Sequence, residues 1–337
     1  MSIYLENGYL DIEKILSYKM PFNFIVGGRA TGKTYGALKY AYESHTRFIL
    51  MRRTQAQTDL INKVEFNPYK AINQDLDTDI KVKSISKYNS KIYEPAEDGE
   101  QLLGYTCALS TISNMRGFDA SDCRLLIYDE FIPERHERPI KGEGAAFLNA
   151  YESINRNREL RGEDPLQVLG LANAFNIANP IFLELGLVGR CEKMKNTDQE
   201  LFIDKERGIL LVLLRHSRIS KAKADTALYR LSSGSYNDMA LSNDFIYNNA
   251  DNIKAQALKE YKLLCTVGEI SIYRHKSNRE YYVSEHRTGT APVYKSDEVG
   301  LMRYRRKHGL ILAPAYVNNR VQFENILTKS LFELYTI

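Results

Sequence analysis

Short apolar runs alternate with helix-like segments along the first two thirds of the chain. The apolar runs predicted as strands are residues 22–26, 47–51, 105–110, 124–128, 167–172 and 210–214. Residues 35–44 and 145–155 contain good helix formers and no proline, which predicts two helices between these strands. Strands that alternate with helices indicate an open α/β sheet. The runs at 124–128 and 167–172 are typical of strands buried on both faces of a parallel sheet. A hairpin is also predicted within the first two thirds of the chain, at residues 81–93, from the alternation on both sides of Asn89 and Ser90.

The pattern of the chain becomes more polar after residue 215. Residues 216–250 are rich in Ser, Asn and Lys, which predicts a linker. The elements predicted beyond it are a helical segment at 251–265, strands at 269–274, 280–283 and 309–313, and a last helix at 323–335. The expected parts are a first domain at 1–215, the linker at 216–250 and a small α+β domain at 251–337.

The composition is that of an ordinary globular protein. Of 337 residues, 44% are apolar and 26% are charged, and this length favours two domains. No basic lead precedes an apolar stretch at the N-terminus, so no signal peptide is expected. No apolar run approaches the roughly 20 residues that span a bilayer, so no membrane contact is expected. The four cysteines lack zinc-site spacing and are expected to be reduced packing residues in a cytosolic protein.

Positive charge is concentrated in the last quarter of the chain. Residues 251–337 contain 14 Lys and Arg against 9 Asp and Glu, whereas the other residues contain 32 against 33. The excess fits either a surface that faces nucleic acid or a solvated surface. The densest basic stretch within residues 251–337 contains Arg303, Arg305, Arg306 and Lys307. The predicted hairpin also carries alternating lysines, which either contact nucleic acid or protect a strand edge from aggregation.

The first apolar run leads into GGRATGKT at residues 27–34, which matches the phosphate-binding motif G-x-x-x-x-G-K-[ST]. Its glycines permit a loop whose N–H groups turn inward around phosphates, at the positive end of the following helix. Lys33 is expected to reach the β- and γ-phosphates, and the Thr34 hydroxyl to bind Mg²⁺. The residues expected to contact the nucleotide are Gly27, Gly28, Arg29, Ala30, Thr31, Gly32, Lys33, Thr34 and Tyr35.

The run at 124–128 delivers two acids, Asp129 and Glu130, to the same edge of the predicted sheet. Asp129 is expected to hold Mg²⁺, and Glu130 to act as the general base that polarises the attacking water. This adjacent glutamate is typical of additional-glutamate (ASCE, RecA-like) ATPases. The absence of the guanine motif N-K-x-D favours ATP over GTP. Asn173, after the run at 167–172, is either a γ-phosphate sensor or a turn cap.

Arginines follow the predicted helix at 145–155 in the sequence NRNRELRG. Either Arg156 or Arg158 could neutralise charge on a neighbouring subunit's ATP, or the cluster is a solvated helix end. Arg52 and Arg53 end the second predicted strand and either couple the nucleotide to DNA or pair with acids. Arg116 is a further candidate for DNA or nucleotide contact.

The sequences VGGRATGKTY, YDEF, NRNRE and LANAFNIANPIF occur in an order and spacing that resemble the DNA-packaging ATPases of phi-29-like short-tailed phages. The resemblance is specific over residues 20–185 and weaker beyond them. It implies a P-loop ATPase domain at 1–215 with a mostly parallel sheet. It also implies that 251–337 resembles an RNase H-like terminase nuclease that has lost activity. The sequence RRTQ departs from relatives that carry a lysine after the arginine pair.

The resemblance implies a ring motor, usually of five subunits, that pumps double-stranded DNA without sequence preference into an empty capsid. The ring docks at the capsid portal in the host cytoplasm and is absent from the mature virion. It uses ATP and Mg²⁺, and its arginine finger, acting in trans, corresponds to Arg156. Some members dock through a phage-encoded structural RNA.

Two other functions stay open at the level of sequence. A complete terminase would cut DNA with metal-binding acids in the last domain, where Glu269, Glu280 and Glu285 are nearest to the first predicted strand. No Asp lies on the inner alternation of that strand, which favours a domain without catalytic activity. A nucleotide-gated binding module would bind ATP tightly and hydrolyse it slowly, although Glu130 argues against it.

Overall fold

The computed structural model describes residues 2–337 except positions 98, 116, 135–136, 138–139, 216 and 232–251. The chain divides into two compact units, Met1–Tyr247 and Asn248–Ile337. Most of the predicted linker lies outside the described residues, as does the candidate Arg116. The described part of the linker contains two short helices, α8 (Arg218–Lys223) and α9 (Ala227–Leu231).

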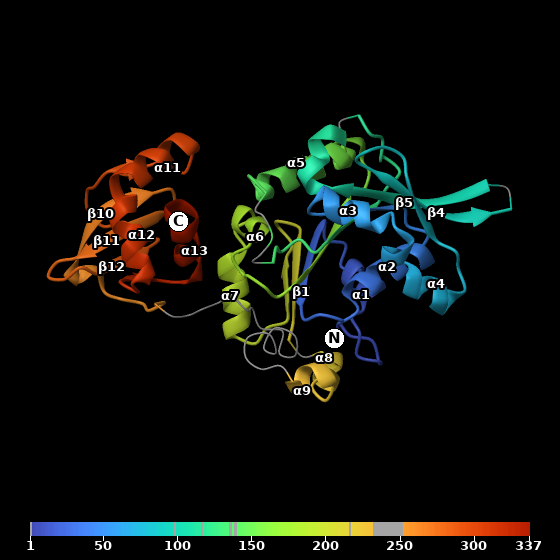
Figure 1. The fold of residues 1–337 in the computed structure, drawn as a ribbon, viewed down its shortest axis with the longest axis horizontal. Coiled ribbons are helices and arrows are strands. Elements are labelled where there is room, and N and C mark those ends of the chain that lie inside the picture. The colour runs from blue at the N-terminus through green and yellow to red at the C-terminus, as the bar shows by residue number, and fades with distance from the viewer. Residues whose placement is uncertain are drawn as a thin grey trace. The chain divides into compact units, whose positions relative to one another are not determined.

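A mixed sheet forms the centre of the first unit (Figure 1). Within the described residues it has nine strands in the order β3-β4-β5-β2-β6-β7-β1-β9-β8. The strands are β1 (Phe22–Gly27), β2 (Phe48–Arg52), β3 (Lys81–Ser84), β4 (Ser90–Ala96), β5 (Gly99–Ala108), β6 (Leu125–Asp129), β7 (Gln167–Asn173), β8 (Leu201–Asp204) and β9 (Ile209–Leu214). In this spatial order, every pair of neighbouring strands from β5 through β2, β6, β7 and β1 to β9 is parallel. The strands at the two edges, β3 and β4 on one side and β8 on the other, pair in an antiparallel way. The predicted α/β sheet and its hairpin are confirmed.

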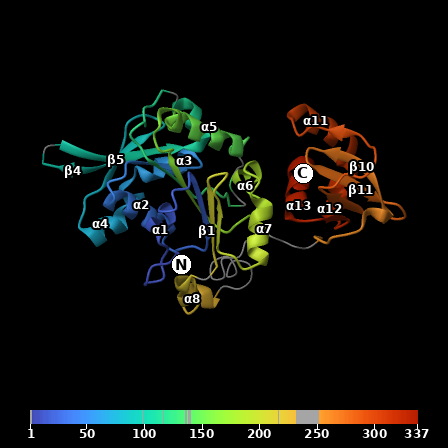
Figure 2. The same cartoon turned by 180° about the vertical axis from the view of Figure 1, so that it is seen from behind.

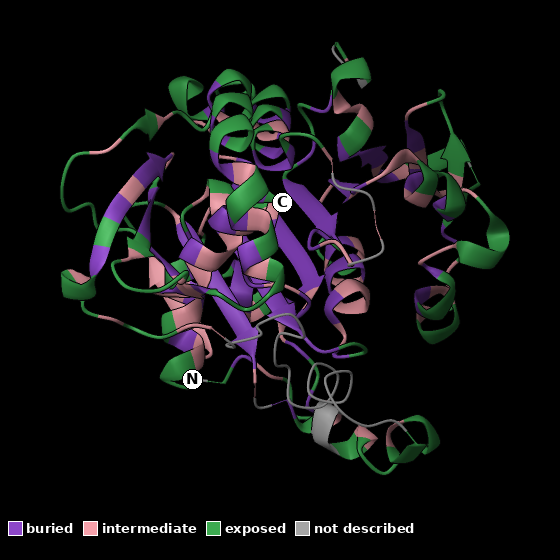
Figure 3. Cartoon of the chain, turned by 60° about the vertical axis from the view of Figure 1, so that its left-hand side comes forward, coloured by how far each residue is buried: buried purple, intermediate pink, exposed green. Residues whose placement is uncertain are grey.

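Helices cover both faces of this sheet (Figure 2). They are α1 (Ile12–Leu16), α2 (Lys33–Glu43), α3 (Gln55–Ile61), α4 (Lys70–Leu76), α5 (Glu143–Asn155), α6 (Pro180–Glu184) and α7 (Val188–Asn196). Neighbouring residues of β1 point to opposite faces. Phe24 packs against Phe147 of α5 and Phe182 of α6, whereas Ile25 belongs to a cluster shared with α1, α2 and α4. The strands are therefore buried from both sides (Figure 3).

The second unit has its own sheet, in the order β13-β10-β11-β12-β14. Its strands are β10 (Tyr261–Val267), β11 (Ile270–His275), β12 (Tyr281–Ser284), β13 (Val293–Tyr294) and β14 (Val321–Phe323). Its helices are α11 (Glu298–Tyr304), α12 (Leu310–Val317) and α13 (Ile326–Thr336), and a π-helical turn, η5 (Arg305–Gly309), joins the first two. No helix among the described residues of either unit is long and apolar enough to cross a membrane.

Two elements predicted for the second unit are wrong. The segment predicted as a helix at 251–265 contains no α-helix among its described residues and leads into strand β10. The segment predicted as a strand at 309–313 is helical, because α11 continues through η5 into α12. The last helix begins at Ile326 rather than at residue 323, since Asn325 caps it and the preceding residues pair as β14.

Candidate nucleotide-binding site

Three parallel strands bring the predicted site residues to one edge of the first sheet. The strand β7 lies between β1, which precedes the phosphate loop, and β6, which carries the acids. Gly27 pairs in register with Asn173, and Asp129 pairs with Leu171 on the same strand, β7. The carboxyl ends of neighbouring parallel strands are where open α/β sheets bind ligands.

The loop at 28–32 turns tightly into helix α2. Gly32 has a φ of 82° and Ala30 a φ of 56°, so two residues in the left-handed region shape the turn. A Cβ atom placed on Gly27 would lie 2.6 Å from Cβ of Leu214, which explains the need for glycine there. The Thr31 hydroxyl is buried and donates to the carbonyl of Gly28 at 3.1 Å. The N-terminus of the 11-residue helix α2 thus faces this loop, an arrangement that favours anions.

Lys33 is buried inside the loop, with 7% of its surface exposed. Its Nζ donates to the carbonyl of Gly28 at 2.6 Å and to Oδ1 of Asn173 at 3.3 Å. Burial lowers the pKa of Lys33 from 10.5 to about 7, although the nearby Asp129 carboxylate opposes this change. Because phosphate would favour the charged amine, Lys33 is suited to an anionic ligand.

Thr34 and Asp129 together provide oxygen atoms suited to a hard divalent cation. The Thr34 hydroxyl lies 3.1 Å from each carboxylate oxygen of Asp129. Asp129 is 3% exposed, and burial raises the pKa of its carboxyl group, while Arg52 acts in the opposite direction. Mg²⁺ prefers oxygen ligands and usually keeps several waters, so these two residues fit the predicted role.

Arg52 holds both acids at the end of β6. Its Nη2 lies 2.9 Å from Oδ2 of Asp129, and its Nη1 lies 2.6 Å from Oε2 of Glu130. The side chain of Glu130 is half exposed, and its backbone has a φ of 58°. In this arrangement one carboxylate oxygen of Glu130, Oε2, is paired with the Arg52 guanidinium. Of the two roles expected for Arg52, coupling of the nucleotide to DNA and pairing with acids, the second is the one seen in this structure.

The remaining predicted nucleotide contacts lie at the rim of the loop. Arg29 pairs with Glu134 at 2.5 Å, and its guanidinium carbon lies 5.8 Å from the centre of the Phe175 ring. Tyr35 donates to Asp75 at 2.7 Å, and this hydrogen bond, followed by burial, raises the pKa of Tyr35 to about 12. A cavity of about 680 Å³ beside the loop is lined by Tyr35 and by the N-terminal residues around Tyr9.

The two candidate finger arginines have very different surroundings. Arg156 ends α5, and its side chain is 39% exposed. It donates to Asp119 at 3.0 Å and to the carbonyl of Phe118 at 2.8 Å. Arg158 is fully buried and donates to the carbonyls of Ser121 and Cys123. A side chain that reaches another subunit must be exposed, which favours Arg156 over Arg158 as the candidate finger.

The sequence left the partners of Arg53 open, and one further contact near the site was not predicted. Arg53 is fully buried between α5 and the region before it, where it pairs with Glu143 at 2.6 Å and Glu137 at 2.8 Å. Lys223 of α8 donates to the backbone carbonyl of Arg29. The Arg53 pair could have been suspected from the charges alone, but nothing in the sequence places residue 223 beside residue 29.

The basic stretches and acids predicted for DNA contact or cutting are not among the residues of this site. Arg305 donates to the last carbonyls of α13, at Tyr335 and Leu334, and its neighbours Arg303, Arg306 and Lys307 are exposed. Lys91 of the hairpin pairs with Glu100. The described residues contain no group of three or more His, Cys, Asp or Glu that could hold a metal ion.

A strand, a phosphate loop and a helix at residues 22–43, with acids at a neighbouring strand end, have the arrangement of P-loop nucleotide-binding proteins. The model of the podovirus DNA encapsidation protein (Gp16) family matches residues 6–332. The chain belongs to this family, which confirms the resemblance stated from the sequence.

Individual relatives are similar over almost the whole chain. The DNA packaging proteins of Bacillus phage PZA and Bacillus phage phi29 are 25% and 24% identical to it, with 96% of both chains covered in each case. A chain of the bacteriophage Phi-29 viral genome packaging motor assembly aligns with a TM-score of 0.65 and 20% identity, over 99% of each chain. The Phi-28 gp11 DNA packaging motor aligns with a TM-score of 0.62 and 18% identity, over 96% of each chain. These alignments show a shared fold.

Proposed function

We propose that the protein is an ATP-driven double-stranded DNA translocase that packages a viral genome into an empty capsid. Membership of the DNA encapsidation family supports the process, and the site supports the source of energy. The observation that carries the proposal is the convergence of Lys33, Thr34, Asp129 and Glu130 at one sheet edge. This set can hold phosphates, a divalent cation and an attacking water together.

Each residue of the site has a defined task in this proposal. Lys33 and the loop N–H groups bind the phosphates, and bound Mg²⁺ would neutralise charge on them. Glu130, whose Oε2 lies 2.6 Å from Nη1 of Arg52, accepts the proton of the attacking water. Asn173, 3.3 Å from Lys33 Nζ, is placed to contact the terminal phosphate. A general base such as Glu130 typically contributes 10²–10⁴-fold to a rate.

The assembly follows from the proposed activity and from the relatives. A ring of subunits, five in the expected case, would dock at the capsid portal and place Arg156 at the nucleotide of a neighbouring subunit. The second unit would act without nuclease activity and contact DNA, the portal or a structural RNA. The protein would work in the cytoplasm of the infected host and be absent from the mature virion.

The steady-state ATPase rate, with and without long double-stranded DNA, tests this function. Wild type and Glu130→Gln are compared at one salt concentration, because phosphate contacts make DNA binding salt-sensitive. We expect DNA to stimulate wild type and the variant to lose at least about 100-fold in rate while still binding ATP. The matched control is Glu206→Gln, which changes an exposed glutamate in the turn between β8 and β9.

Three results would contradict the proposal in different ways. A slow rate that is indifferent to DNA, in the presence of portal-bearing empty capsids, would favour a nucleotide-gated binding module. Nicking of plasmid DNA with Mn²⁺, lost in Glu269→Gln or Glu280→Gln, would favour a complete terminase. A footprint on one DNA sequence at physiological salt would exclude binding without sequence preference.

A further inference from the structure

Helix α8 contacts the phosphate loop and the segment beside it. Lys223, at the end of α8, donates from Nζ to the backbone carbonyl of Arg29 within the loop. At the start of α8, a Cβ atom placed on Gly8 would lie 3.0 Å from Cβ of Arg218. The residue after Gly8 is Tyr9, whose ring lies 2.7 Å from a Cβ placed on Gly32. Both ends of α8 thus touch structures that form or flank the loop.

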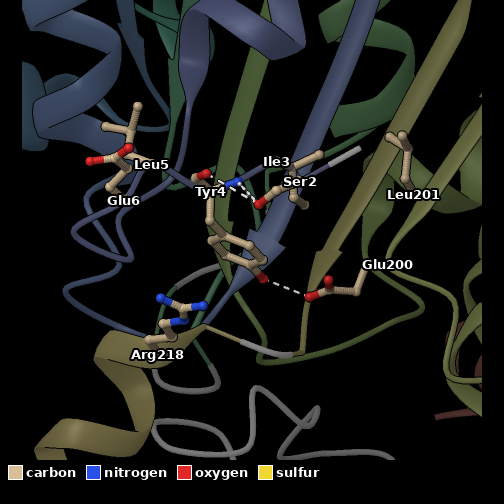
Figure 4. Close-up of a pocket in the computed structure, with 8 residues that line it drawn as sticks. All are labelled: Ser2, Ile3, Tyr4, Leu5, Glu6, Glu200, Leu201 and Arg218. Carbon is tan, nitrogen blue, oxygen red and sulfur yellow. Dashed lines mark hydrogen bonds between the residues drawn. The ribbon is translucent and has the colours of Figure 1, made fainter.

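The start of α8 borders a cavity. A cavity of about 510 Å³ is lined by Arg218 together with residues 2–6 and with Glu200 and Leu201. Figure 4 shows Arg218 below Tyr4, whose hydroxyl donates to Glu200 at 2.6 Å.

The cationic side chains around the loop outnumber the carboxylates that form ion pairs with them. Lys223 is half-buried, and among the described residues no carboxylate pairs with it. Burial lowers the pKa of the Lys223 amine. Lys223 and Arg29 both lie close enough to Lys33 to lower the pKa of Lys33 further. Of these three cations, Arg29 has a direct ion pair, with Glu134.

Lys223 contacts the loop at the residue next to one that Lys33 contacts. Lys33, whose amine reaches the β- and γ-phosphates in this motif, donates to the carbonyl of Gly28 at 2.6 Å. The carbonyl that Lys223 contacts belongs to Arg29, the next residue.

We propose that Lys223 is a second phosphate-binding lysine, which contacts the terminal phosphates of a nucleoside triphosphate bound in the same subunit and thereby holds α8 on the loop. The inference rests on the proposed nucleotide site. It adds a regulatory consequence, because α8 stands in the sequence between the first sheet and the second unit. Loss of the terminal phosphate would release α8 from the loop.

Nucleotide binding by Lys223→Met tests the proposal. The affinities for ATPγS and for ADP are measured with excess Mg²⁺ on the full chain, together with wild type and Lys223→Arg. Lys205→Met is the matched control, since Lys205 is an exposed lysine in the turn between β8 and β9. We expect Lys223→Met to weaken ATPγS binding about tenfold, as the loss of one charge-assisted hydrogen bond predicts, and ADP binding much less. Lys223→Arg should bind nearly as wild type does.

Amide hydrogen exchange of residues 217–231 gives the second measurement. ATPγS should slow exchange there in wild type and in Lys205→Met, and have no such effect in Lys223→Met. Unchanged ATPγS affinity in Lys223→Met, equal weakening of both nucleotides, or the same loss in Lys205→Met would overturn the inference. In each of these results the loss of ATPase activity in Glu130→Gln would still support the function. If wild type binds neither nucleotide, the inference and the proposed function fail together.

Discussion

The protonation of Lys33 makes nucleotide binding depend on pH in a predictable direction. In the nucleotide-free protein, burial lowers the pKa of Lys33 from 10.5 to about 7. Bound phosphates favour the charged amine, so binding should be accompanied by proton uptake above this pKa. At pH 6 the Lys33 amine is charged in about nine tenths of the nucleotide-free protein, and at pH 8 it is charged in about one tenth. The affinity for Mg-ATPγS should therefore fall about tenfold between pH 6 and pH 8.

Titration calorimetry in two buffers of different ionisation enthalpy measures the proton uptake directly. We expect about half a proton per nucleotide at pH 7 and about nine tenths at pH 8. Lys33→Arg is the control, because a guanidinium stays charged over this range and should remove the pH dependence. An affinity that is constant from pH 6 to pH 8, with no proton uptake in wild type, would refute the reasoning.

The same ionisation affects folding in the absence of nucleotide. The folded-state pKa of Lys33 lies below the unfolded value, so between about pH 7 and 10.5 the unfolded chain binds more protons at this position. The contribution of Lys33 to stability therefore rises as pH increases through this window and is lost as pH falls. Lys33→Met should remove this contribution from the pH dependence of the unfolding free energy.

Three further predictions concern the arginines around the site. Arg156→Ala should leave the unfolding free energy almost unchanged but abolish ATPase activity, and mixing it with Glu130→Gln should restore some activity; no recovery at any ratio would exclude a finger acting in trans. Arg158→Ala should instead destabilise the fold by about 2 kcal/mol in denaturant unfolding, because its buried hydrogen bonds to Ser121 and Cys123 are lost. Arg53→Met should cost about 3–5 kcal/mol by leaving Glu143 buried and unpaired, and Arg53→Met with Glu143→Leu should recover much of that loss; equal instability of the single and double variants would contradict this account.

The first unit could be predicted well because its signals are local. The phosphate loop is a contiguous motif, and the buried parallel strands appear as unbroken apolar runs. The arginine contacts could not be predicted in the same way, since they join residues far apart in sequence. Arg52 and Arg53 are adjacent, yet one pairs with Asp129 and Glu130 while the other is buried against α5.

The second unit was harder to predict because two backbone irregularities hide its pattern. The register of β10 shifts between Leu263 and Cys265, which breaks the alternation by which a strand is recognised. The run at 309–313, predicted as a strand, begins with Gly309 and is followed by Pro314. In the structure a π-helical turn carries the chain through Gly309 without ending the helix, and no local pattern in the sequence announces that turn.

The end of helix α5 shows how a fold can accept a less favourable residue. Arg156 and Asn157 both have positive φ values, 48° and 55°, and the first of them is the C-terminal cap of α5. Glycine is the residue that this cap conformation favours, and a residue with a Cβ atom costs roughly 1–2 kcal/mol there. Stability alone would select glycine at position 156. Under the proposed finger role of Arg156, the arginine at this position trades stability for activity, and Arg156→Gly should yield a more heat-resistant but inactive protein.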